Sequence, residues 1–149
     1  MKNDEKAIIF TDGGSRGNPG PSAIGVVICD AGGKTLKAYA EDIGKGTNNE
    51  AEYHAVISAL KKAKSLFGTE KSKQKEIDVY SDSELMVKQL NGEYKVHDDR
   101  MKMFFMEVWN LKMDFKCVTF CHIMREQNVQ ADQLLNQKLD EVEGKGKLF

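Results

Sequence analysis

An apolar run that passes directly into a glycine-rich turn is the feature that most constrains this chain. The run, Ala7-Ile8-Ile9-Phe10, is followed by Asp12 and by a stretch, residues 11–21, that holds four glycines and both prolines of the protein. A short apolar run bounded by such breakers is typical of a buried strand. We therefore predict that Asp12 stands at the end of a strand, where a carboxylate can meet a ligand while the sheet holds it still. Taken alone, an Asp-Gly pair is also ordinary turn chemistry.

The rest of the chain alternates between strand-like and helix-like segments. Further strands are expected at 22–29, 35–41, 76–81 and 117–123, and helices from about 50 to 67, 83 to 90, 98 to 113 and 128 to 139. The short turn at 30–34 indicates a hairpin between the second and third strands. This order predicts an α/β fold with a five-stranded mixed sheet. Three antiparallel strands come first, two strands are then added by helical crossovers, and helices cover both faces.

Length and composition limit the possible classes of protein. A chain of 149 residues without a linker predicts a single domain over 1–149, with flexible termini at 1–6 and about 143–149. No apolar run approaches the roughly 18 residues of a membrane span, and residues 1–6 lack an apolar signal core. We therefore expect a cytoplasmic protein that does not enter the membrane. The net charge of −1 shows no basic surplus, so a polyanionic ligand would need positive charge from elsewhere, and divalent metal is the natural source.

Four carboxylates stand at positions where they could meet. Asp12 and Asp82 follow two strand-like runs, and ligands collect at strand ends in crossover α/β segments. On its helix, Glu52 is in phase with the apolar stripe and points toward the sheet, whereas Glu50 is rotated by about 200° and should face water. A carboxylate on an apolar face is costly unless it is paired or binds metal. The alternative for Glu52, and for Asp132 near the start of the last helix, is an acid favoured by the helix dipole.

Together these acids predict a metal centre. Carboxylates that converge repel one another, which raises some of their pKa values. A cluster rich in oxygen ligands suits hard cations such as Mg²⁺ or Mn²⁺. Two such ions, about 3.5–4 Å apart, can clamp an in-line phosphoryl displacement.

Four motifs also carry a resemblance to a known family. They are Thr11-Asp12-Gly13-Gly14-Ser15 with Gly17-Asn18-Pro19-Gly20-Pro21, Thr47-Asn48-Asn49-Glu50-Ala51-Glu52-Tyr53, Ser81-Asp82-Ser83-Glu84-Leu85, and Arg125-Glu126-Gln127-Asn128-Val129-Gln130-Ala131-Asp132. In this order, from about Ile8 to Asn136, the chain resembles type 1 ribonuclease H. The resemblance implies the fold given above. It also implies endonucleolytic cutting of the RNA strand of an RNA/DNA hybrid, leaving 3′-hydroxyl and 5′-phosphate ends.

The resemblance assigns roles by position. Asp12 would bridge two Mg²⁺ ions, and Asp132 would help hold the ion that presents the attacking water. Glu52 and Asp82 would hold the ion near the leaving oxygen, and Glu52 would sense a 2′-hydroxyl, which separates RNA from DNA. Contacts with the hybrid are implied for further residues: Gly13, Asn18, Asn48, Asn49, Glu84, Arg125 and Asn128.

Some of these positions leave alternatives open. Glu84 stands where many members carry a glutamine that contacts the RNA, so an acid there could weaken binding or bring another carboxylate near the metals. A guanidinium at Arg125 suits a phosphate contact, but a salt bridge to Glu126 or Glu41 is the alternative. His122 matches a histidine that in some members sits in a flexible loop and helps to move protons or release product, and it could equally end the strand.

Other departures bear on the substrate and on rival functions. The segment 91–96 lacks the basic helical handle of many bacterial members, which indicates weaker substrate affinity, and we expect no separate hybrid-binding module before residue 7. We expect a monomer. A non-catalytic hybrid-binding module is a rival that missing carboxylates would favour. A resolvase or transposase core is another, and the glycine-rich loop argues against it. A small-molecule phosphatase lacks any nucleophile or phosphate-loop pattern.

Overall fold

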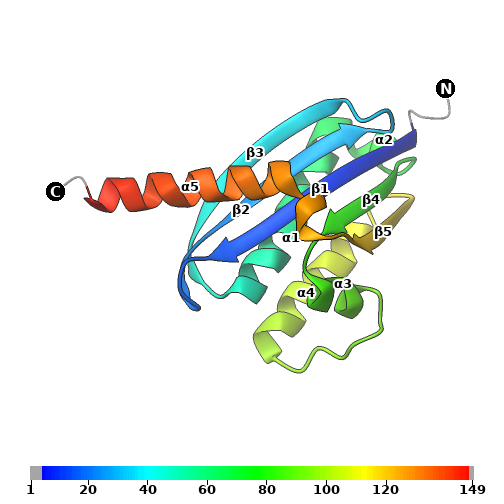
Figure 1. Ribbon diagram of the computed structural model, residues 1–149. Coiled ribbons are helices and arrows are strands. Elements are labelled where there is room, and N and C mark those ends of the chain that lie inside the picture. Colours follow the sequence, from blue (N-terminus) through cyan, green and yellow to red (C-terminus); the bar gives the residue numbers. More distant parts are fainter. Residues whose placement is uncertain (1–4, 148–149) are drawn as a thin grey trace.

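The computed structural model describes residues 5–147, with side chains as far as Gly144. Its elements are β1 Lys6–Ser15, β2 Gly20–Asp30, β3 Thr35–Gly46, α1 Asn48–Phe67, α2 Thr69–Ser72, β4 Glu76–Ser81, α3 Glu84–Leu90, α4 Asp99–Lys112, β5 Cys117–His122 and α5 Val129–Lys147. In Figure 1, α5 lies across one face of a twisted sheet, and α1, α3 and α4 lie on the other side. Within the described part of the chain, no helix combines the length and apolar character needed to cross a bilayer.

The sheet has the predicted topology. Its strand order is β3-β2-β1-β4-β5, with β2 antiparallel to both β1 and β3, and with β4 parallel to both β1 and β5. The three N-terminal strands are joined by short turns, whereas β4 and β5 are reached through helices, as parallel pairing requires. The predicted α/β fold with a mixed five-stranded sheet is confirmed.

Alternate residues of β1 serve the two faces of the sheet. Ala7 and Ile9 are buried in the large core under α1, which continues through β2, β4 and β5. Ile8 and Phe10 point the other way and pack with Val27, Cys29 and Ala131 beneath α5. This two-residue alternation lets one central strand bury side chains on both sides. It also places the helices that carry Glu52 and Asp132 against opposite faces of β1.

The predicted bounds hold best where the sequence carries a cap. Thr47 caps α1 through a reciprocal pair with Glu50, in which the Thr47 hydroxyl accepts from the Glu50 amide and the Glu50 carboxylate accepts from the Thr47 amide. The helix ends at Phe67, as predicted, and Gly68 follows it as the C-cap. The polar segment expected as a loop at 69–75 contains the short helix α2.

Three predicted element ends are wrong. β1 does not stop at the acid but continues to Ser15, where it pairs with Ser22 of β2, and β3 continues to Gly46, where it pairs with Gly20 of β2. The last helix continues from the predicted end at Leu139 to Lys147, so residues 143–147, expected in a flexible terminus, are helical. Arg16 pairs with Asp140 and Glu143 and so ties this extension to the β1–β2 turn. Residues 1–4 and 148–149 of the predicted flexible ends lie outside the described residues.

Candidate active site

Asp12 lies within β1, at the point where β1 extends beyond the end of its parallel neighbour β4. The parallel register with β4 ends at the pair Thr11–Ser81, while Asp12 still pairs with Gly25 of β2. The side chain is 5% exposed. The prediction that Asp12 ends a strand is therefore wrong, but the carboxylate does stand at the end of the β1–β4 pairing, beside the residue that follows β4. That residue is Asp82.

Glu52 reaches Asp12 because β1 and α1 pass unusually close to each other. A Cβ on Gly13 would lie 2.2 Å from the Ala51 carbonyl oxygen, so only glycine permits this approach. The Gly13 amide donates to Glu52 Oε1 at 3.1 Å. As the phase of the helix predicts, Glu52 faces the sheet, and it is partly buried. Gly13 thus positions an acid with its backbone rather than presenting a free donor.

The side chains of three acids converge. Oxygen atoms of Asp12, Glu52 and Asp82 all lie within 4.8 Å of one another. Asp82 is held by the turn into α3, where the Ser83 amide donates to Ser81 Oγ and the Ser83 hydroxyl caps the helix by accepting from the Met86 amide. Asp132, in the first turn of α5, is a close electrostatic neighbour of Asp12.

Burial and mutual repulsion raise the pKa values of the two inner acids. The pKa of Asp12 is raised to about 8, first by burial and then by the charges of Asp82 and Asp132. The pKa of Glu52 is raised well above its usual range, again first by burial and then by Asp12 and Asp82, and Arg125 opposes the shift. A bound cation would relieve both effects, and carboxylate oxygens are the ligands that hard divalent cations prefer. The residues present therefore fit Mg²⁺ or Mn²⁺.

The carboxylates open into a groove of about 580 Å³ between the β1–β2 hairpin and α5. Its walls include Arg125, the only cationic residue besides Arg16 among the described residues that line it. Neither alternative partner is paired with Arg125, since no ion pair to Glu126 or Glu41 occurs among the described side chains. The guanidinium is exposed at the rim, beside the acids.

Two asparagines form hydrogen bonds beside the groove: Asn48, which lines it, and Asn18 next to Asn48. The Ser15 amide donates to Asn48 Oδ1 at 2.9 Å, and the Asn48 amide donates to Asn18 Oδ1 at 3.0 Å. These bonds join the glycine-rich hairpin to the corner between β3 and α1. Both asparagines are exposed, but their side-chain oxygens are engaged within the protein, which leaves the amide nitrogens for a ligand.

Other predicted contact residues lie outside the groove. Asn49 lines a separate pocket with residues of the α3–α4 loop, and Glu84 sits in the first turn of α3, where it pairs with Lys88 at 3.1 Å. His122 is the last residue of β5 rather than part of a loop, and it is exposed. Asn128 is 1% exposed and donates to the Thr11 carbonyl at 2.9 Å, so its side chain links α5 to β1 instead of facing a substrate.

Two sets of contacts around the site were not foreseen. The Glu50 side chain is 12% exposed and pairs with Arg100 of α4, so the prediction that it faces water is wrong. Arg16 binds α5 through Asn136, Asp140 and Glu143. The spacing of these three residues by four and then three positions places them on one helix face, a pattern that could have indicated a common partner.

Comparison with known proteins agrees with this geometry. A model of the reverse transcriptase-like family matches residues 10–138. A solved structure of LC11-RNase H1 in complex with an RNA/DNA hybrid is 45% identical with a TM-score of 0.86, covering 91% of this chain and 98% of that one. Ribonuclease HI of Halobacterium salinarum is 36% identical over 132 residues, which are 89% of this chain and 63% of that protein.

A longer relative matches over only part of its length. Bifunctional protein Rv2228c of Mycobacterium tuberculosis is 38% identical over 137 residues, which are 91% of this chain. The chain spans 36% of the length of that protein.

Proposed function

The chain belongs to the type 1 ribonuclease H family, and on that premise we propose that it is a metal-dependent endonuclease that hydrolyses the RNA strand of RNA/DNA hybrids. One observation carries the proposal: oxygens of Asp12, Glu52 and Asp82 lie within 4.8 Å of one another, with Asp132 beside them, in an open groove. Family members of the same length class include a protein whose structure was solved with an RNA/DNA hybrid. The groove holds about 580 Å³ and is lined by residues of β1, α1 and α5 as well as by the acids.

Asp12, Glu52, Asp82 and Asp132 would hold two divalent cations. When bound, such cations activate a water and stabilise the charge on the attacking and leaving oxygens of an in-line displacement, giving 5′-phosphate and 3′-hydroxyl ends. The protein keeps these acids in place before metal arrives. The Gly13 amide fixes one oxygen of Glu52, the β1–β2 ladder fixes Asp12, and the capped start of α3 fixes Asp82.

Other residues of the groove would hold the hybrid. Arg125 provides a fork of donors suited to a backbone phosphate. Asn48 lines the groove, and its backbone amide donates to Asn18 Oδ1, so the exposed side-chain amides of both residues would be available to the hybrid. The free oxygen of Glu52 is the group that would test for a 2′-hydroxyl.

The proposal is tested by cleavage of end-labelled substrates after removal of metal with a chelator. We expect cleavage of the RNA strand of a hybrid on addition of Mg²⁺ or Mn²⁺, and none in the chelator. Single-stranded RNA, duplex DNA and a four-way DNA junction should stay intact. The fragment ends, read by phosphatase and ligase treatment, should be 5′-phosphate and 3′-hydroxyl.

The control is Asp12→Asn, which keeps the shape of the side chain and removes its charge. This variant should fold and should cut no faster than background. Hybrid binding without turnover in either metal would favour a non-catalytic module, and cleavage of the junction would favour a resolvase.

A further inference from the structure

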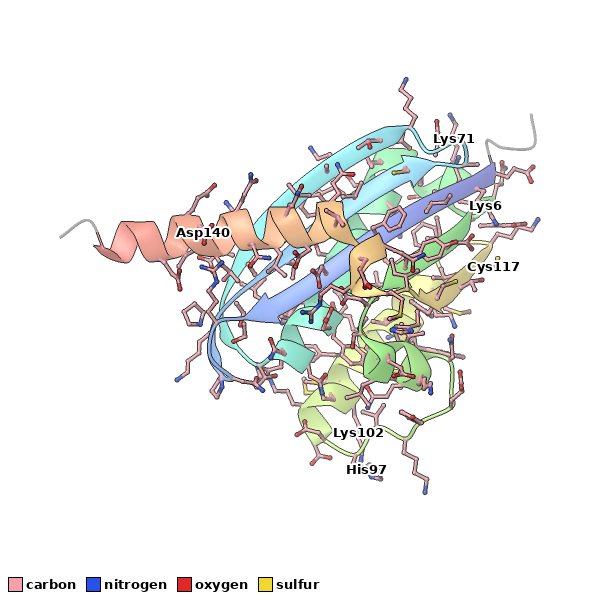
Figure 2. All side chains as sticks on the ribbon, in the orientation of Figure 1. Lys6, Lys71, His97, Lys102, Cys117 and Asp140 are labelled. Atoms are coloured by element: carbon pink, nitrogen blue, oxygen red, sulfur yellow. The ribbon has the colours of Figure 1, made fainter. Side chains whose placement is uncertain are left out.

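Arg16 connects the hairpin at one end of the groove to the far half of α5. Its Nη1 donates to Asp140 at 2.7 Å and to Glu143 at 2.5 Å, and its Nη2 donates to Asn136 Oδ1 at 3.2 Å. Figure 2 shows Asp140 on α5, well along the helix from its start near the sheet. The backbone of Arg16 is itself fixed, because its amide donates to the Pro21 carbonyl across the turn at 2.8 Å. The guanidinium of an anchored residue therefore contacts one face of α5.

Asn136 connects Arg16 to a carboxylate of the site, because it binds both. Its Nδ2 donates to Asp132 Oδ1 at 3.1 Å and to the Asp132 carbonyl at 2.9 Å. An amide side chain has a donor end and an acceptor end, whereas a guanidinium can only donate and a carboxylate can only accept. With Arg16 on one side and Asp132 on the other, a single orientation of the Asn136 amide satisfies both neighbours.

We infer that Arg16 and Asn136 are positioning residues for Asp132. Arg16 holds the oxygen of the Asn136 amide, so the nitrogen of that amide faces Asp132 and fixes the rotamer of its carboxylate. Without Arg16 the amide can rotate and bring its oxygen toward the carboxylate, where two acceptors repel. The inference rests on the proposed function for the purpose that it assigns to Asp132, since hydrogen-bonded partners behind a metal ligand orient it and raise the affinity for metal.

The acidic side chains of α5 explain how Arg16 divides its donors between two directions. Asp140 and Glu143 occupy the Nη1 arm and leave the Nη2 arm directed at Asn136. A lysine has a single ammonium on a flexible stem and cannot divide its donors between these two directions. Arg16→Lys therefore keeps the ion pairs that hold α5 and removes the contact with Asn136.

The test compares Asn136→Ala, Arg16→Ala, Arg16→Lys and the double variant Arg16→Ala with Asn136→Ala. Lys138→Ala is the matched control, because Lys138 makes an exposed ion pair with Glu141 on the same helix and does not line the groove. Mn²⁺ binding is measured by calorimetry without substrate, and the Mn²⁺ requirement for cleavage is measured separately. Melting temperatures in chelator report on folding.

We expect Asn136→Ala to raise the half-saturating Mn²⁺ concentration about tenfold in both titrations. Its KM for the hybrid at saturating Mn²⁺ should stay within about twofold of the wild-type value, since this residue acts on the metal ligand. Arg16→Lys should shift the metal titration in the same direction without lowering the melting temperature. The double variant should be no worse than Asn136→Ala, because Arg16 acts through Asn136.

Two results would overturn the inference. One is a metal titration of Asn136→Ala and Arg16→Lys that coincides with that of Lys138→Ala. The other is a fully additive double variant, which would show that Arg16 acts independently of Asn136. If the wild-type protein cut no hybrid while the metal titrations shifted as expected, the proposed activity would fail and the positioning role would stand.

Discussion

Asp12 and Glu52 share one property, which is that their surroundings favour the neutral acid. Burial is the main cause for both, and the neighbouring carboxylates add to it. A protein selected only for stability would not place acids in this way, because each costs free energy whenever it is ionised. The arrangement becomes favourable when a cation is present to balance the charge. We read the two raised pKa values as the electrostatic mark of a metal centre.

The pKa of Asp12 sets a pH dependence for the metal-free protein. Its pKa is about 8 in the fold against an ordinary 3.8, so between these values the folded state holds a proton that the unfolded chain has released. The free energy of unfolding must then fall as the pH rises, by at most about 1.4 kcal/mol per pH unit for one proton. Urea unfolding in chelator between pH 5 and 8 should show this loss. Asp12→Asn should reduce this loss and leave the part that comes from Glu52, and equal slopes in both proteins would contradict the assignment.

Arg125 should act on substrate affinity rather than on the metal. We expect Arg125→Ala to raise KM about tenfold, since a charge-assisted bond to phosphate contributes on the order of 1–3 kcal/mol, and to lower the salt dependence of binding by about one charge. Lys71→Ala is the control, because Lys71 is exposed on α2, away from the groove (Figure 2). A KM that does not change in Arg125→Ala would exclude the phosphate contact.

At the scale of elements, glycines decide how close α1 and α5 come to the sheet. A Cβ at Gly13 would meet the Ala51 carbonyl at 2.2 Å, and one at Gly25 would meet the Ala131 carbonyl at 2.1 Å. Gly25 pairs with Asp12, the residue next to Gly13 on β1, and the two glycines face opposite helices, so α1 and α5 both approach the sheet closely at the level of Asp12. This close approach lets acids from two helices reach one strand.

Gly13→Ala tests this close approach. The added methyl group cannot be accommodated without moving the strand or the helix, so we expect a loss of about 1–3 kcal/mol in the free energy of unfolding and a larger relative loss of cleavage, because Glu52 moves with α1. Gly32→Ala is the control, since its nearest contact would be Asp30 Oδ1 at an ordinary 3.5 Å. Chemical unfolding and cleavage rates of both variants give the answer. A Gly13→Ala protein as stable and as active as the control would refute the tight packing.

The sequence predicted elements well where local chemistry fixes them. The Thr47 cap and Gly68 define α1, and the apolar phase of that helix correctly turned Glu52 toward the sheet. Gly13 and Gly14 were interpreted as breakers, but here they are strand residues whose missing side chains admit a helix. Local patterns cannot distinguish these two uses of glycine, since the second depends on a partner far along the chain.

The sequence predicted the acids of the site better than it predicted the residues that hold those acids in place. Asp12, Glu52 and Asp82 converge as expected. The bond between Asn136 and Asp132, the contact of Arg16 with α5, and the pairing of Glu50 with Arg100 all depend on tertiary placement. The family motif alone did not reveal that the Asn128 side chain faces inward, where it is buried and donates to the Thr11 carbonyl.

The whole molecule is nearly neutral, with a net charge of −1, while its groove gathers four acids. When these acids are ionised they repel a polyanion, and Arg16 and Arg125 are the only cationic residues that oppose them among the described residues of the lining. Metal binding therefore serves attraction as well as chemistry, and the molecule should depend on divalent ions for substrate binding and for stability alike. This links the electrostatics of a few residues to the behaviour of the entire fold.

Divalent metal should stabilise the protein measurably. A ligand that binds only the native state contributes about 2.7 kcal/mol when its free concentration is 100 times its Kd. For a chain of this size that corresponds to a rise in Tm of about 5–10 °C. Thermal unfolding in Mg²⁺ should be compared with unfolding in NaCl of equal ionic strength. Identical curves would argue against a cation site on the native state.

The most direct measurement is a calorimetric titration of Mn²⁺ into chelator-treated protein near pH 7, with wild type and Asp12→Asn side by side. The wild-type protein should bind the ion and release protons into the buffer, since the cation displaces them from the acid cluster, and the heat should therefore change with the ionisation enthalpy of the buffer. Asp12→Asn, folded and at least as stable without metal, should show little or no binding. An Asp12→Asn titration that matches the wild type would contradict a metal centre built on these carboxylates.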